Sequence, residues 1–77
     1  MKTITISLPS VDAVRNFNNK IFGLSGDFDL GSGRYIVDAR SIMGIFSLDL
    51  SKPVSLTINS DNEEVVVEAI REFIVTE

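Results

Sequence analysis

The sequence predicts one small α+β domain over residues 1–77, and two patterns indicate this class. Residues 3–8 and 54–58 alternate polar with apolar side chains, which is typical of strands with one buried face. Residues 11–23 and 62–75 repeat apolar side chains every three or four positions, which is typical of amphipathic helices. Strands with one apolar face need a single covering layer, which two such helices can provide.

The first strand is expected over residues 3–8, with Ile4 and Ile6 on its buried face. A helix is expected to follow over residues 11–23. Ser10 precedes that helix and can cap it, because a serine hydroxyl accepts a free amide of the first turn. Gly23 or Gly26 can end it.

Two short strands are expected next, over residues 27–30 and 35–38. Gly31-Ser32-Gly33 lies between them and favours a hairpin, because glycine reaches positive φ at little cost. A short helical segment is expected over residues 41–50, with Ser41 as its N-cap. Gly44 lowers the intrinsic helix propensity of this segment.

The last strand, at residues 54–58, follows Pro53. Ser60 and Glu63 have the spacing of a capping box and predict a helix over 62–75, which completes the order βαββαβα. The helical stripes predict these buried residues: Phe17, Ile21, Val66, Ile70 and Phe73.

Composition argues against several classes of protein. The chain has 7 basic and 11 acidic residues, a net charge of -4, whereas a nucleic-acid binder usually carries a basic face. It has no cysteine, which excludes disulfides and thiolate metal sites. No apolar run reaches membrane-spanning length, and no signal-peptide pattern is present, so we expect a cytoplasmic protein.

Three aspartates, Asp27, Asp29 and Asp38, are the candidates for a metal site. Alternation places Asp27 and Asp29 on one strand face, opposite Phe28 and Leu30. A solvated strand face is the commoner reason for such aspartates. We therefore predict no metal site and no cofactor.

Residues 38–48, with the sequence DARSIMGIFSL, resemble the segment around the regulatory serine of the HPr proteins, the phosphocarriers of the sugar phosphotransferase system. The element order agrees over the whole chain, and the resemblance is close over residues 27–73. It implies an HPr-like open-faced β-sandwich, in which helices cover one side of a four-stranded antiparallel sheet.

The start of the first helix departs from this family. The family has a His-Ala-Arg-Pro stretch there, and its histidine takes the phosphate. Here the matching positions are Ser10, Val11, Asp12 and Ala13, and the chain has no histidine. An acidic residue at this place opposes a phosphate. The chain is closer to the Crh-type paralogues, which keep the regulatory serine without the histidine, although those retain the arginine.

Each candidate site residue has two interpretations. Ser10 is better explained as an N-cap than as a replacement phosphoacceptor, because no histidine can act as its base. Ser41 is both a candidate cap and, by the resemblance, the site for an HPr kinase/phosphorylase. Ile42, Met43 and Phe46 either dock a protein partner, as the resemblance implies, or fill the core.

These observations predict no enzyme and no catalytic residue. The resemblance implies a regulatory protein-binding module of the phosphotransferase system that is switched by phosphorylation at Ser41. Its expected partners are a kinase/phosphorylase or a transcriptional regulator. Two alternatives stay open. One is a diverged HPr-family domain with an unrelated partner, and the other is a phosphocarrier with a non-histidine acceptor.

Overall fold

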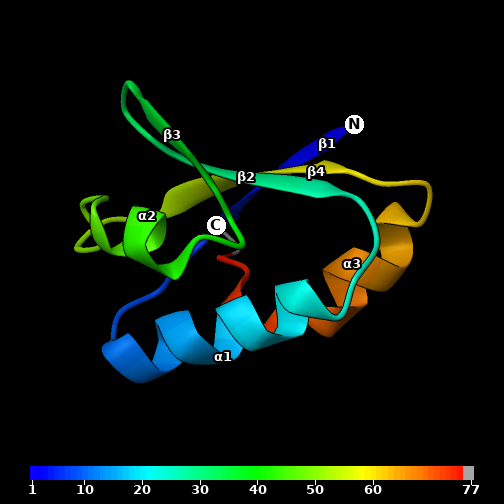
Figure 1. The fold of residues 1–77 in the computed structure, drawn as a ribbon, viewed down its shortest axis with the longest axis horizontal. Helices are drawn as coiled ribbons and strands as arrows, with labels where there is room; N and C mark the ends of the chain where they lie inside the picture. The colour runs from blue at the N-terminus through cyan, green and yellow to red at the C-terminus, as the bar shows by residue number, and fades with distance from the viewer. Residues whose placement is uncertain (76–77) are drawn as a thin grey trace.

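A computed structural model describes residues 1–75 and places a four-stranded antiparallel sheet over α1 and α3, with α2 at one end (Figure 1). The predicted element order βαββαβα is confirmed. The elements are β1 (Lys2–Ile6), α1 (Val11–Phe22), β2 (Asp27–Ser32), β3 (Tyr35–Asp38), α2 (Ile42–Phe46), β4 (Val54–Asn59), α3 (Glu63–Ala69) and the 3₁₀ turn η1 (Arg71–Phe73).

The strands lie in the order β1-β4-β2-β3, so the last strand of the chain is an inner strand. It pairs with β1, where Ile4 faces Leu56, and with β2, where Phe28 faces Ile58. Within β4, Val54, Leu56 and Ile58 are buried, while the alternate residues lie on the helix-free face. The period-two alternation therefore marks the two sheet faces as predicted.

The hairpin between β2 and β3 is tighter than predicted. Strand β2 continues to Ser32, which pairs with Tyr35, so only Gly33 and Arg34 form the turn. Gly33 has φ 59°, and no non-glycine residue in the described chain has positive φ, which fits a type II′ turn with glycine first. Gly31 and Ser32 are strand residues because they pair across the hairpin.

The five residues predicted to be buried all lie in the core. Phe17 of α1 meets Phe73 edge-on, with the ring centroids 5.6 Å apart and the planes at 89°. Lys20 lies over the same Phe73 ring and forms an ion pair with Glu72. The amphipathic stripes of the two helices thus meet each other as well as the sheet.

The predicted helix over residues 62–75 is too long. α3 ends at Ala69, a 3₁₀ turn follows, and Ile74 is extended and bridges to Ile6. The Ser7 amide donates to the Phe73 carbonyl at 2.8 Å, and the Val75 amide donates to the Thr5 carbonyl at 2.9 Å. Pairing with β1 gives these backbone groups partners that a longer helix would not provide.

The predicted capping box does not form. The Ser60 hydroxyl donates to the Ser25 carbonyl at 2.9 Å and accepts the Asn62 amide at 3.2 Å. Asn62 is the N-cap of α3 and makes no side-chain cap bond. The serine is bound to a loop 35 residues away, a contact that local spacing does not reveal.

Candidate protein-docking site

The site is built around the start of α2, where Ser41 is the N-cap. Its backbone is extended (φ -88°, ψ 100°), its hydroxyl accepts the Gly44 amide at 3.2 Å, and its carbonyl accepts the Ile45 amide at 2.9 Å. The predicted cap is confirmed. The helix is shorter than the predicted 41–50, because Ser47 ends it and its hydroxyl donates to the Gly44 carbonyl.

Arg40 precedes Ser41, but its guanidinium group binds elsewhere. It donates to the Gly26 carbonyl at 2.7 Å and to the Leu24 carbonyl at 2.6 Å, and it lies 5.0 Å from the Phe28 ring centroid. These contacts occupy its planar fork and fasten the loop between α1 and β2. The sequence shows no signal for this role, because the accepting carbonyls belong to a loop.

Asn18 of α1 is the only buried polar side chain of the described residues. Its amide group donates to the Ala39 carbonyl at 3.3 Å and to the Arg40 carbonyl at 3.0 Å. The residue thus joins α1 to the segment that leads into Ser41. The sequence does indicate that Asn18 is buried, since this polar residue lies on the apolar stripe of the helix, four residues after Val14.

The apolar side chains of α2 divide between the core and the surface. Ile45 is buried, and Ile42 packs partly against the core. Met43 is 78% exposed and Phe46 is 42% exposed. The alternative that all three candidates fill the core is therefore wrong for Met43 and Phe46.

The start of α1 lies at the same end of the molecule as α2, and the two helices pack together (Figure 1). Ser10 caps α1 as predicted, and its hydroxyl accepts the Ala13 amide at 3.1 Å. Val11 is 54% exposed, and Asp12 is an exposed acid in the first turn. This end of the molecule therefore combines two capping serines with exposed apolar side chains.

The loop after α2 is held by a local polar contact. The Ser51 hydroxyl and the Ser51 amide both donate to Oδ1 of Asp49. Both hydrogen bonds favour the charged carboxylate and therefore lower the pKa of Asp49 below its ordinary value. The hydroxyl of Ser51 contributes more to this shift than the amide does.

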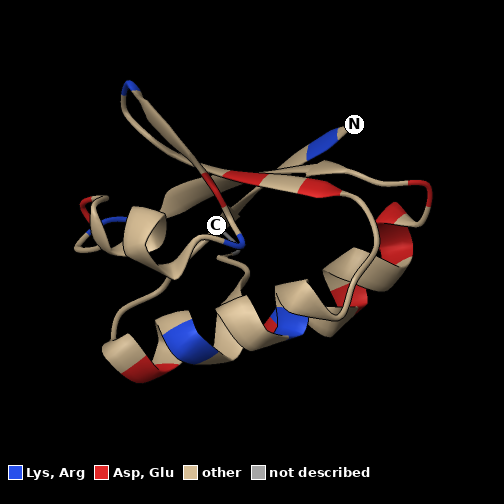
Figure 2. Ribbon diagram, in the orientation of Figure 1, with Lys and Arg blue, Asp and Glu red and all other residues tan. Residues whose placement is uncertain are grey.

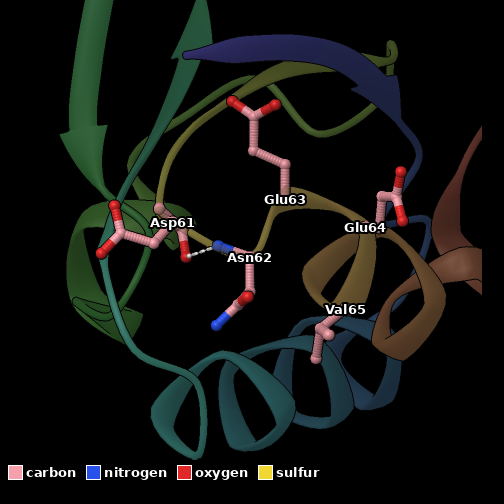
Figure 3. Close-up of a pocket in the computed structure, with 6 residues that line it drawn as sticks. Asp61, Asn62, Glu63, Glu64 and Val65 are labelled. Atoms are coloured by element: carbon pink, nitrogen blue, oxygen red, sulfur yellow. Dashed lines mark hydrogen bonds between the residues drawn. The ribbon is translucent and has the colours of Figure 1, made fainter.

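Two groups of acidic residues lie on separate surfaces of the part of the chain that the structure describes. Asp27 and Asp29 point to the helix-free face as predicted, and no group of three or more potential ligands within residues 1–75 is arranged for a metal. At the start of α3, the carboxylates of Asp61, Glu63 and Glu64 point in different directions around a shallow hollow (Figure 3). Figure 2 shows that acidic residues dominate this end of α3.

None of the helices in residues 1–75 combines the length and the apolar content needed to span a bilayer.

No protein-family model matches the chain, and no curated protein matches it. Solved structures do match. The HPr-C-His protein of Thermoanaerobacter tengcongensis is 28% identical with a TM-score of 0.81, covering 96% of this chain and 91% of its own. The phosphocarrier protein HPr of Bacillus anthracis is 22% identical with a TM-score of 0.74, covering 96% and 94%.

A third match is the histidine-containing phosphocarrier protein of a mycoplasma, at 9% identity. Its TM-score is 0.73, and the match covers 92% of this chain and 86% of the other. At such low identity the likeness concerns the fold alone. The four-stranded antiparallel sheet and its helices are thus those of the HPr phosphocarriers of the phosphotransferase system, and the chain is HPr-like in fold although it has no histidine.

Proposed function

We propose that this chain is an HPr-like regulatory module that binds a protein partner through α2 and the start of α1 and is switched by phosphorylation of Ser41. The observation that carries the proposal is that α2 exposes apolar side chains on its outer face. Ile45 is buried and anchors the helix, while Met43 and Phe46 are exposed within the five residues that follow the exposed Ser41. Exposed apolar side chains at one site favour a protein interface.

The absence of histidine argues against a phosphohistidine carrier. Ser10 is a poor replacement, because its hydroxyl is engaged by the Ala13 amide and no histidine is available as a base. Asp12 in the first turn of α1 adds negative charge where a phosphoryl group would arrive. A regulatory module therefore accounts for these residues better than a carrier with a serine acceptor.

Phosphorylation of Ser41 would add about -1.5 to -2 charges close to Met43. Arg40 is held by the carbonyls of Leu24 and Gly26, so it leaves that charge available to a partner. Partners that bind the apolar side chains should lose affinity, whereas a partner that offers arginines should gain it. The modification would thus change the choice of partner.

The test of the switch is incubation with an HPr kinase/phosphorylase and ATP, followed by intact mass and a map of the modified residue. We expect one phosphate on Ser41, none on Ser41→Ala, and unchanged modification of Ser10→Ala and Ser47→Ala. Phosphate on Ser10 or Ser47 with Ser41 unmodified would reject the assignment.

The test of docking is the affinity for the same purified kinase/phosphorylase. Met43→Asp should weaken binding at least tenfold. The matched control is Val65→Asp, because Val65 is a 58% exposed apolar residue of α3, far along the chain from α2. Equal effects of the two variants would contradict docking through α2.

The test against a carrier is incubation with labelled phosphoenolpyruvate and the general phosphotransferase enzyme. We expect no label on the chain. Ser10→His alone should restore little transfer, because Asp12 remains in the first turn of α1. An acid-labile label on the wild-type chain would refute the proposal.

A further inference from the structure

The edge strand β3 presents apolar side chains that the proposed function does not use. Tyr35 is 74% exposed and Ile36 is 73% exposed, and both belong to a hairpin that projects beyond the helices (Figure 1). Natural sheets usually protect their edges, because an unpaired strand can pair with another chain. The opposite edge, β1, is already engaged, since Thr5 and Ser7 bond to the segment after α3.

The register of the hairpin determines which backbone groups of β3 face away from β2. The Ala39 amide donates to the Phe28 carbonyl at 2.8 Å, so residue 39 points toward β2. In an antiparallel pair, hydrogen-bonded residues alternate with those that face away. The register of Leu30 with Val37 then makes Val37 face β2, while the amide and carbonyl of Ile36 face outward.

The charges along this edge complement a second copy of the same edge. In an antiparallel pair centred on Ile36, the turn residue Arg34, just before β3 of one copy, comes near Asp38 at the end of β3 of the other, and this happens twice because of the two-fold axis. The hairpin is basic at its tip and acidic where β3 ends (Figure 2). Arg34 forms no ion pair within residues 1–75, so it is available for this contact.

In this register, apolar side chains of the two copies also meet on the same face of the sheet. Ile36 lies on the helix-free face beside Gly31, and it would meet the second Ile36 there. Tyr35 lies on the other face and would meet Val37 of the second copy. Three observations therefore select one register: the outward backbone groups, the opposite charges and the exposed apolar pair.

We propose that β3 is a self-association site, at which two copies of this chain pair antiparallel about Ile36 to form one continuous eight-stranded sheet. The strand is short, from Tyr35 to Asp38. A four-residue strand buries little surface, and interfaces smaller than about 1,200 Å² are usually weak or transient. The dimer is therefore reversible and forms at high protein concentration.

The first test is sedimentation velocity over a range of concentrations. The wild-type chain should shift from monomer to dimer. Ile36→Asp should weaken the dimer at least tenfold, because it places two like charges on the axis, while the control Val65→Asp should leave it unchanged. A chain that stays monomeric, or a dimer indifferent to Ile36→Asp, would overturn the proposal.

Charge exchange tests the register. Arg34→Asp and Asp38→Lys should each weaken self-association, because like charges would face each other in both homodimers. An equimolar mixture of the two variants should recover the dimer, since both contacts are then attractive. Circular dichroism checks that Asp38→Lys stays folded, because Oδ1 of Asp38 accepts the Arg40 amide. A mixture no stronger than the separate variants would reject this register.

A cross-link provides a readout independent of affinity. The chain has no cysteine, so Ile36→Cys introduces a single thiol at the two-fold axis. Opposed residues of a hydrogen-bonded antiparallel pair have Cα atoms about 5.5 Å apart, within disulfide range. Diamide should therefore cross-link Ile36→Cys much faster than Val65→Cys. Equal rates would count against the proposal.

Discussion

Asn18 determines how the chain approaches Ser41, although it is 23 positions away in the sequence. Its two hydrogen bonds satisfy the carbonyls of Ala39 and Arg40, one of which is buried. Arg40 then holds the loop after α1 through two further carbonyls. Four backbone carbonyls without partners of their own are thus satisfied by two side chains, which fixes the geometry before α2.

Replacing Asn18 tests this connection. Asn18→Leu should lower the free energy of unfolding by about 1–3 kcal/mol, because two carbonyls lose their donor. Asn18→Asp keeps the shape but directs a carboxyl at two carbonyl oxygens, so burial should raise the pKa of that carboxyl in the folded state. A raised folded-state pKa means that this carboxyl costs no stability through ionisation below about pH 4, and that the cost appears as the pH rises through the folded-state value. Urea titrations between pH 3 and pH 8 would measure both effects, and a pH profile parallel to the wild type would contradict them.

At the scale of the element, α2 depends on its glycine. A Cβ atom built on Gly44 would lie 3.2 Å from Cβ of Val37 and 3.2 Å from Oγ of Ser41. The glycine that lowers helix propensity therefore lets α2 lie close against β3. Close packing also leaves the outer face of a five-residue helix free for Met43 and Phe46.

A larger side chain should force this helix away from the sheet. Gly44→Leu should destabilise the protein by about 1–3 kcal/mol, because overpacking displaces Val37 or the helix. It should also expose Ile45, which an apolar dye would detect. Denaturant titration measures the first effect, and a variant as stable as the wild type would show that α2 can move without cost.

The packing of the segment after α3 depends on the side chain of Phe73. Phe73 is 7% exposed, packs edge-on against Phe17 and directs its carbonyl to the Ser7 amide. Phe73→Ala should therefore cost about 3–5 kcal/mol, the usual range for a buried phenylalanine. A loss below about 1 kcal/mol in a urea titration would show that the ring is not part of the core.

The sequence predicts those features whose causes are local. The strand at residues 54–58, the helix at 11–23 and the caps Ser10 and Ser41 depend on side chains within a few positions. The end of α3 and the use of Ser60 could not be predicted, because they depend on β1 and on Ser25.

In the candidate site, too, the features with local causes could be predicted and those that depend on distant residues could not. The position of Ser41 at a helix start could be predicted from the serine and the apolar residues after it. The exposure of Met43 could not, because it depends on which side of α2 faces β3. The role of Arg40 depends on carbonyls 14 and 16 residues away.

At the scale of the whole molecule, the two proposed surfaces lie on different sides of the sheet. Ile36 is on the helix-free face, whereas α2 packs on the face that carries Val37. Ile36→Lys and Met43→Lys should each change stability by less than about 1 kcal/mol, because both side chains are exposed. The double variant should show the sum of the two effects within about 0.5 kcal/mol. Thermal or urea unfolding of the four proteins would measure this, and a larger deviation would show that the surfaces are coupled.

The inner position of β4 has a consequence for synthesis on the ribosome. Before residues 54–59 emerge, the only strand pair available to the nascent chain is the β2–β3 hairpin, which alone is marginally stable. Strand β1 must wait for β4, so Ile6, which is fully buried in the finished protein, lacks its cross-strand partner Val54 until then. A chain stalled before β4 would therefore keep apolar surface exposed that chaperones and proteases recognise, and the sheet would form only when β4 emerges.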